Sequence, residues 1–477
     1  MDQTVKPRIG LLLLGHPDYQ NDIALHFASQ GVEALRQGGL EAVFDQTAHV
    51  KPLEAAAAAR QLLRQDVEGV IILPGTWLEG DVATAAIREI EHLPFALWGL
   101  PMFEHDGQRE STGSFVAVCA LKGPLTRMGY AFKSIIGLPE RAETIASLTA
   151  WAYAAHAAER LKRLRAGLIG YSAMHIYAGM FDHVLLRRHI GPEIVHLDTY
   201  TLIREAERVS PEAVEALAAR VKGLASVEAT DERLRKACGL GVALQNLVER
   251  HHLDALTVKC QYELSQEYGM TPCLPMALLA DEGLVASCEG DVMVLVTQAL
   301  LKLLTGQVAP YGDILDLDGD TMLLSSCGFA PFSLAHEGPP AGTPDTPAGD
   351  DGTPDTPVGH CGGPDKSVGR TGVRRVCEFG HPGFDGLICS FTLKRGPVTI
   401  ARLSEGVGDY KLLYATGTGI ETDLRQGRFP ALQIKLDGDP QALLENIASQ
   451  HFALCYGDQS ERLEDWCRIA RVQAVRV

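Results

Sequence analysis

In the first third of the chain, short apolar runs alternate with stretches in which apolar positions recur every three to four residues. The runs predict strands, and the stretches between them predict helices. The expected strands are 8–15, 41–45, 67–75, 94–100 and 131–137, and the expected helices lie near 20–37, 52–64, 80–92, 112–127 and 141–164. Because strands that alternate with helices form parallel sheets, we expect a doubly wound α/β domain over residues 1–164.

The same alternation continues over the next part of the chain. Its expected strands are 166–172, 193–198, 255–261 and 284–288, and its expected helices are 211–226, 231–250 and 275–281. A second α/β domain with a doubly wound parallel sheet is therefore expected over residues 165–312.

After residue 313 the apolar positions alternate with a period of two between glycine-rich turns, which indicates an antiparallel sheet or barrel. The segments with this pattern are 314–328, 396–404, 410–419, 431–438 and 451–456, followed by a last helix at 459–470. We expect a β-rich C-terminal domain over 313–477. Residues 337–372 repeat GTPDTP and lack apolar periodicity, so we expect a disordered insertion there.

Composition narrows the function. The chain has 477 residues and a net charge of −17, which argues against nucleic acid or an anionic membrane as a partner. Its eleven cysteines show no paired spacing, as expected of free thiols in a reducing compartment. No targeting segment or membrane-spanning apolar run is visible, so the expected location is cytoplasmic. The GxGxxG, Walker and GxSxG motifs are absent, which disfavours nicotinamide enzymes, ATP enzymes and serine hydrolases.

One stretch, 283–313, carries the strongest candidate site. Its apolar strand ends at Glu289, Gly290 allows a sharp turn, and Asp291 can cap the helix that follows, with Gly306 as its stop. A second acid, Asp313, follows the helix. Open α/β sheets bind ligands at the carboxyl ends of their strands, so this is a candidate site. The alternative is a helix cap at Glu289 and a loop residue at Asp313.

A late histidine completes a constellation of two carboxylates and one imidazole. His451 opens the strand HFALCY, and with Glu289 and Asp313 it forms a donor set that suits Mn²⁺, Mg²⁺ or Co²⁺. His16, at the end of the first strand, is a candidate contact for a polar ligand; the alternative is an ordinary turn residue.

A series of motifs between about 250 and 470 resembles the L-fucose isomerase / L-arabinose isomerase superfamily in order and context. They are KCQYEL at 259–264, CEGDV at 288–292, LTG at 304–306, PYGD at 310–313, SCGFAP at 326–331, GPVTIARL at 396–403 and QHFALCYGD at 450–458. The resemblance implies that Glu289 and Asp313 are catalytic and metal-binding, and that His451 is a metal ligand. The arabinose branch has a further histidine ligand where this chain reads Ser325–Cys327, which favours a three-ligand, fucose-like site.

The resemblance also implies that Lys259 and Gln261 contact the sugar, although Gln261 can equally be a strand-end residue that satisfies backbone groups. The expected activity is a metal-dependent, Mn²⁺-preferring aldose–ketose isomerisation of an open-chain monosaccharide through a cis-enediol, in a homo-oligomer such as a hexamer. L-fucose, D-arabinose, L-arabinose and a substituted hexose all remain open as substrates. The alternative function is a non-catalytic sugar-binding or sensor protein of periplasmic-binding-like architecture.

Overall fold

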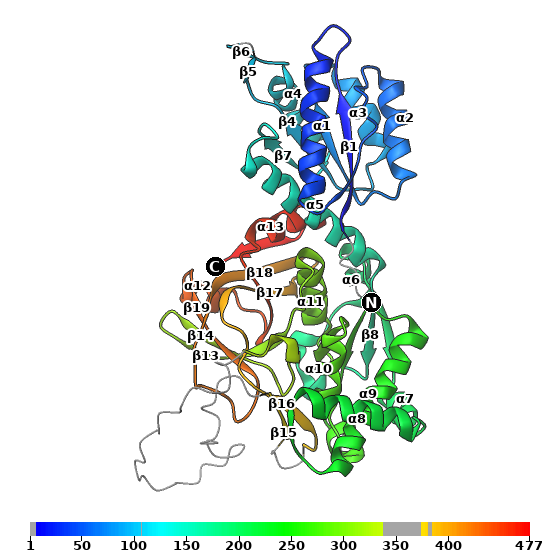
Figure 1. Ribbon diagram of the computed structural model, residues 1–477, viewed down its shortest axis with the longest axis vertical. Helices are drawn as coiled ribbons and strands as arrows, with labels where there is room; N and C mark the ends of the chain where they lie inside the picture. The colour runs from blue at the N-terminus through cyan, green and yellow to red at the C-terminus, as the bar shows by residue number, and fades with distance from the viewer. Residues whose placement is uncertain (1–5, 106, 337–373, 380–383) are drawn as a thin grey trace.

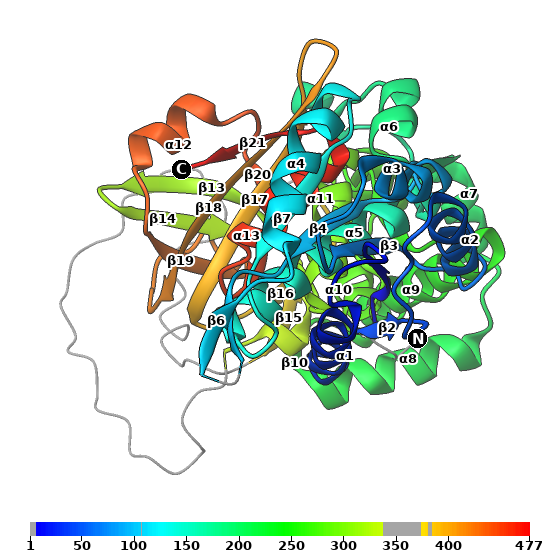
Figure 2. The same ribbon diagram turned by 90° about the horizontal axis from the view of Figure 1, so that it is seen from above.

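The computed structural model describes residues 6–105, 107–336, 374–379 and 384–477, and it confirms the expected fold class. One α/β unit stands above two further units that lie side by side (Figure 1). Viewed from above, the strands of the C-terminal unit lie to one side and the helices of the other lower unit to the other (Figure 2). The expected insertion at 337–372 lies outside the described residues.

The upper unit contains a five-stranded parallel sheet in the order β2-β1-β3-β4-β7, as the alternation predicted. Its strands are β1 (Arg8–Leu14), β2 (Glu41–Val43), β3 (Gly69–Pro74), β4 (Phe95–Gly99) and β7 (Phe132–Ile136). Its helices are α1 (Asn21–Gln37), α2 (Pro52–Leu63), α3 (Gly80–Glu89), α4 (Ser114–Arg127) and α5 (Ala142–Arg163), and a hairpin of β5 (Phe103–His105) and β6 (Gln108–Glu110) is added. The strands β3 and β4 are buried along their whole length, which accounts for their continuous apolar runs.

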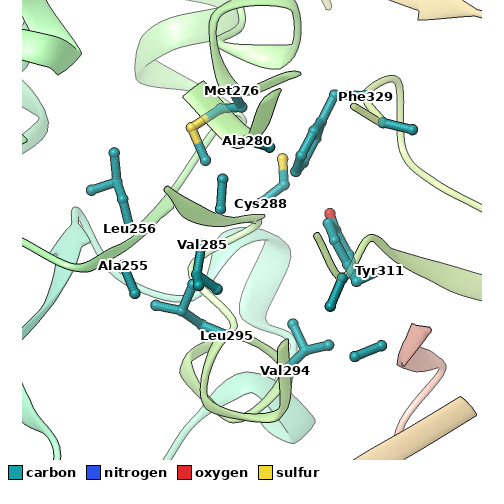
Figure 3. Close-up of a cluster of buried hydrophobic side chains, with 14 of the residues drawn as sticks. Ala255, Leu256, Met276, Ala280, Val285, Cys288, Val294, Leu295, Tyr311 and Phe329 are labelled. Carbon is teal, nitrogen blue, oxygen red and sulfur yellow. The ribbon is translucent and has the colours of Figure 1, made fainter. Parts of the chain in front are cut away.

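The second unit contains a four-stranded parallel sheet in the order β12-β11-β8-β9. Its strands are β8 (Arg165–Ile169), β9 (Glu193–Leu197), β11 (Ala255–Val258) and β12 (Val285–Cys288). Its helices are α6 (His183–His189), α7 (Thr199–Ala206), α8 (Pro211–Leu224), α9 (Asp231–His251), α10 (Cys273–Asp281) and α11 (Val292–Thr305), with single turns η1 (Ala173–His175), η2 (Tyr177–Gly179) and η3 (Glu263–Tyr268). Within the core at the end of β12, Tyr311 and Phe329 face Cys288 (Figure 3).

The C-terminal unit contains six strands in the order β17-β20-β13-β14-β19-β18, and β17 also pairs with β18, so the sheet closes into an antiparallel barrel. These strands are β13 (Tyr311–Asp318), β14 (Thr321–Ser325), β17 (Gly396–Glu405), β18 (Tyr410–Ile420), β19 (Ala431–Leu436) and β20 (His451–Tyr456). The other elements are β21 (Gln473–Arg476), which adds to β18, α12 (Pro440–Asn446), α13 (Ser460–Ala470) and the turn η4 (Phe332–Leu334). The strands β10 (Ser226–Glu228), β15 (Arg375–Glu378) and β16 (Leu387–Ser390) form a separate sheet.

Helix α11 joins the last two units, because it contacts β11 and β12 of the parallel sheet and β17 and β20 of the barrel. The expected start of the C-terminal domain at residue 313 falls within β13, so Asp313 belongs to a strand and not to a loop. No helix in the described part of the chain is long and apolar enough to cross a membrane.

Candidate active site

The turn after β12 holds Glu289 in an unusual backbone conformation. Its φ is 64°, and Gly290 follows with a φ of 69°. A Cβ at Gly290 would lie 2.1 Å from the carbonyl oxygen of Tyr171, so only glycine fits there. The backbone N–H of Ala173 donates to the carbonyl of Glu289 at 2.7 Å. The turn is therefore fixed against residues 171–173.

Asp291 is fully engaged by three donors. Its Oδ1 accepts from the backbone N–H of Val294 at 3.0 Å, which confirms the expected helix cap. Its Oδ2 accepts from Arg402 Nη1 at 2.7 Å and faces His451 Nδ1 at 2.8 Å. The side chains of Asp291 and Arg402 are each 1% exposed. A carboxylate with its oxygens used in this way orients its neighbours.

His451 and Asp313 lie directly opposite each other on the antiparallel strands β20 and β13. The imidazole Nε2 of His451 lies 3.2 Å from Glu289 Oε2 and 3.4 Å from Asp313 Oδ1. The amide nitrogen of Gln450 lies 3.3 Å from the same Nε2. The side chains of His451 and Glu289 are 0% and 5% exposed, whereas that of Asp313 is 22% exposed. The structure thus brings the three expected residues together, with Asp313 on the solvent side.

The charges in this cluster shift one another's protonation. Burial alone would raise the pKa of Asp291, but the guanidinium of Arg402 and the imidazole of His451 lower it well below its usual range. Burial alone would lower the pKa of His451, but the carboxylates of Asp291, Asp313 and Glu289 outweigh burial and raise it well above its usual value. The cluster therefore favours positive charge at its centre.

The donor set fits a divalent cation in chemistry and in charge. Three carboxylates, those of Glu289, Asp291 and Asp313, face the one permanent positive charge of Arg402. A protonated His451, which its raised pKa favours in the metal-free protein, leaves one negative charge uncompensated, and a neutral His451, which a metal ligand has to be, leaves two. Carboxylate oxygens with one imidazole nitrogen suit hard divalent ions. Within the described residues, however, no group of three or more His, Cys, Asp and Glu side chains forms a ready-made metal centre. The fit is one of donor type and charge.

The expected sugar contacts Lys259 and Gln261 follow β11, the neighbour of β12. Lys259 is 1% exposed; its Nζ lies 2.7 Å from Glu263 Oε2 and 3.8 Å from the centre of the Tyr171 ring. Gln261 is 3% exposed, and within the described structure its Oε1 has no hydrogen-bond partner. An unpaired buried acceptor is available to a ligand. The sugar-binding role of both residues stays a prediction.

His16 is not part of the cluster. It follows β1 in the upper sheet, and its Nδ1 accepts from the backbone N–H of Asp18 at 3.2 Å. This contact is typical of a turn residue, and nothing in the geometry ties His16 to Glu289.

Arg402 is the site residue that the sequence did not single out. It lies in β17 among buried residues, within the motif GPVTIARL. A guanidinium in an otherwise apolar strand was the available signal, because a buried arginine requires a carboxylate partner. Its partner Asp291 was expected only to cap a helix.

Free thiols, which the sequence predicted, gather behind the turn: Cys260, Cys273 and Cys288 are buried and Cys327 is half-buried. Cys260 and Cys288, at the ends of β11 and β12, have their sulfur atoms 3.1 Å apart. A hydrogen bond with Cys288, together with burial, raises the pKa of Cys273 well above the usual thiol value, and burial raises that of Cys327. Protonated, packed thiols of this kind are structural.

The comparisons with known proteins point in one direction. No protein-family model matches the chain. The chain is 23% identical to the sulfoquinovose isomerase of Priestia aryabhattai over 322 residues. This match covers 66% of this chain and 64% of that protein. It is 22% identical to the sulfoquinovose isomerase of Alkalicoccus urumqiensis over 468 residues. This second match covers 94% of this chain and 97% of that protein.

Among solved structures, a periplasmic solute-binding protein from Actinobacillus succinogenes with bound D-allose is 13% identical, with 63% of this chain and 92% of that chain covered. Its TM-score of 0.17 is too low to indicate a common fold. The match thus spans less than two thirds of the first of these relatives, 64% of its length, and 97% of the other, and both are sugar isomerases by name.

Proposed function

We propose that the protein is an aldose–ketose isomerase that acts on an open-chain monosaccharide. The observation that carries this proposal is the convergence of Glu289, Asp313 and His451, which come from three separate segments, at the carboxyl edge of the second sheet. Two carboxylates beside one imidazole can move the two protons that such an isomerisation requires. The sugar isomerase names of the curated relatives support the same reaction class.

Glu289, Asp313 and His451 would hold a divalent cation, with Mn²⁺ as the preferred ion and Mg²⁺ or Co²⁺ as alternatives. The negative charge of the cluster supports this part of the proposal, because a cation that replaces the second proton of His451 would compensate the two negative charges that the neutral imidazole leaves. When bound, the ion would supply Lewis-acid polarisation of the sugar carbonyl.

The two carboxylates divide the proton transfers between carbon and oxygen. One takes the proton from C2 of the aldose, which gives a cis-enediol, and returns it to C1. The other carries a proton between O2 and O1, so that the ketose forms with no net gain or loss of atoms. Asp313 lies on the solvent side and Glu289 is buried, so the substrate would reach Glu289 past Asp313.

The substrate class is a monosaccharide with free C1 and C2 oxygens. Because the curated relatives are named for sulfoquinovose, we place that sugar beside L-fucose, D-arabinose and L-arabinose as candidates. The motif resemblance supports a fucose-like site and a homo-oligomeric assembly.

The test is a panel of these four aldoses with the purified protein and Mn²⁺, read out as ketose formation. We expect one of them to be converted, with activity lost on exhaustive chelation and restored by Mn²⁺. Turnover that survives chelation would refute the proposed requirement for a divalent cation. Tight sugar binding without any conversion would favour a sugar-binding protein over an isomerase.

A further inference from the structure

We propose that Asp291 is a positioning residue that keeps a proton on Nδ1 of His451, and that Arg402 holds Asp291 in place for this task. The inference rests on the proposed function in one respect: it gives the Nε2 of His451 the role of a metal ligand.

The two nitrogens of the His451 imidazole face different partners. A neutral histidine carries one N–H, on either Nδ1 or Nε2, and the hydrogen bonds of the two nitrogens decide which. Asp291 Oδ2 lies 2.8 Å from Nδ1 and can only accept, so this contact requires a proton on Nδ1. The amide nitrogen of Gln450, 3.3 Å from Nε2, can donate to an unprotonated Nε2. Asp291 and Gln450 thus favour the same neutral tautomer, and the carboxylates of Glu289 and Asp313 beside Nε2 hold a second proton there only while no cation takes its place.

That tautomer directs the free lone pair toward the reacting groups. Nε2 lies 3.2 Å from Glu289 Oε2 and 3.4 Å from Asp313 Oδ1, so its lone pair faces the space that the two carboxylates share. Histidines that bind metals commonly donate their second N–H to a carboxylate, which fixes the ring and strengthens the ligand. The Asp291–His451 contact has this arrangement.

Asp291 itself has no freedom to turn toward a cation. One of its oxygens accepts from the N–H of Val294, and the other accepts from Arg402 and His451 together. The guanidinium of Arg402 is itself anchored through its second terminal nitrogen, because Nη2 donates to the carbonyl of Ala178 at 2.6 Å. The guanidinium thus fixes Asp291 from a barrel strand while the carboxylate caps a helix of the parallel sheet. This explains why Glu289 and not Asp291 faces Nε2.

The experiment compares Asp291→Asn with Asp281→Asn. Asp281 is a matched control, since its carboxylate lies outside the cluster and accepts from the backbone N–H groups of Phe332 and Ser333, at 2.8 and 3.0 Å. Two quantities are measured on full-length protein: the affinity for Mn²⁺, and the protonation of His451 Nδ1 by ¹⁵N NMR of histidine-labelled protein with and without diamagnetic Mg²⁺.

We expect Nδ1 to be protonated in the wild-type protein in both states, because a second proton in the metal-free protein would go to Nε2. Asp291→Asn should give a mixture of tautomers and weaken Mn²⁺ binding by about 10–100-fold. Asp281→Asn should change neither. Asp291→Asn with Nδ1 still protonated and Mn²⁺ affinity within about twofold of wild type would overturn the proposal.

Arg402 supplies the second variant pair. Arg402→Lys keeps the positive charge and should retain more Mn²⁺ affinity than Arg402→Met, which leaves Asp291 buried without its cation. Should Asp291→Asn not fold, the Nδ1 signal of Arg402→Lys decides the question, and a signal equal to wild type in both Arg402 variants would contradict the anchoring role. A wild-type protein that binds no Mn²⁺ would refute the metal, while the Nδ1 comparison would still test the positioning.

Discussion

Glu289 is a charged side chain placed where charge is costly. It is 5% exposed, its backbone has a φ of 64°, and its nearest ionic neighbour is the imidazole of His451. A buried carboxylate in a strained backbone conformation is seldom retained for stability alone, and such features concentrate at functional sites. A substitution of Glu289 is therefore the sharpest test of the isomerase proposal.

Glu289→Gln keeps the volume of the side chain and removes its charge. If Glu289 moves a proton and binds the cation, turnover should fall by about 10²–10⁴-fold, the usual contribution of a positioned acid or base. The metal-free protein should melt at the same temperature or higher, because the acidic cluster repels itself without a cation. Turnover, bound Mn²⁺ and melting are measured together.

Asp313→Asn should likewise lose turnover and leave the melting temperature of the metal-free protein unchanged or higher. Its control is Asp316→Asn, because Asp316 lies on the same strand but is exposed and outside the cluster. The double variant of Glu289 and Asp313 should be far from additive, because both acids serve one site. A Glu289→Gln protein that keeps its metal and most of its turnover would contradict the assignment.

Gly290→Ala tests the backbone of the same turn. Two costs combine there: a positive φ of 69° and a Cβ placed 2.1 Å from the carbonyl oxygen of Tyr171. Gly319→Ala is the matched control, because its φ is 58° but no atom lies within 4 Å of the added Cβ. We expect about 1 kcal/mol of lost stability for the control and at least ~2 kcal/mol more for Gly290→Ala, from chemical denaturation. Equal losses would show that the close approach to Tyr171 relaxes without cost.

The sequence predicted part of this residue-scale picture. Glu289 and Asp291 were found because an apolar strand ends in a glycine turn, a pattern that is local. Asp313 and His451 were grouped with them by motif order, whereas their direct pairing depends on strands β13 and β20, far apart in sequence. Arg402 was missed because no local pattern says which carboxylate a buried arginine meets.

At the scale of elements, periodicity predicted the long helices and most strands, and the structure confirms them within a few residues. Short elements were missed, because too few residues make a period visible; they are α6, α7, α12, β5, β6, β10, β15, β16 and β21. The closure of the barrel through β17 and β18 also lies beyond local pattern, because periodicity describes the faces of a strand and not its neighbours.

Glu68, just before β3, ties two strands and a helix of the upper unit together. Its carboxylate accepts from the backbone N–H of Arg8 at 3.2 Å, and it lies 2.6 Å from His156 Nδ1 and 3.0 Å from Arg160 Nε. Burial raises the pKa of Glu68, but the His156 contact and these further contacts together lower it below the usual carboxyl value of 4.5. The folded protein therefore binds this proton less readily than the unfolded chain.

The stability of the folded protein therefore depends on the protonation of Glu68. A lowered folded pKa contributes stability above pH 4.5, and this contribution is lost as the pH falls below that value. Glu68→Gln should cost about 2 kcal/mol at neutral pH, and its difference from wild type should shrink below pH 4.5. Chemical denaturation can be followed by Trp98 and Trp151, which are buried in the same unit. A difference independent of pH would exclude this ion pair as its cause.

At the scale of the whole molecule, the upper unit is attached to the C-terminal helix by contacts that no domain-by-domain interpretation of the sequence predicts. Helix α13 packs against α5 (Figure 1). Lys133 of β7 donates to Asp465 at 2.6 Å and to Glu461 at 2.8 Å, both in α13. The upper unit and the last helix are thus linked through the side chains of Lys133 and Asp465, which are 12% and 2% exposed.

The Lys133–Asp465 ion pair can be tested by comparing a single variant with a double variant. Lys133→Met leaves the buried carboxylate of Asp465 without its cation, and we expect a loss of about 3–5 kcal/mol. Lys133→Met combined with Asp465→Leu should lose much less, since apolar groups then replace the whole pair. Arg60→Met removes an equally short but exposed ion pair with Glu89, 2.6 Å long, and should cost no more than about 1 kcal/mol.

The pH dependence separates a buried charge from a lost contact. Burial raises the pKa of Asp465 even beside Lys133, so protonation of this acid is favoured in the folded protein. The penalty of Lys133→Met should therefore shrink as the pH is lowered, because a protonated Asp465 no longer needs a cation. Chemical denaturation at neutral pH and at lower pH values, followed by the buried Trp466 of α13, measures how the penalty of Lys133→Met changes. A penalty that stays constant with pH, or a double variant as unstable as Lys133→Met, would show that packing and not charge joins the first unit to the last helix.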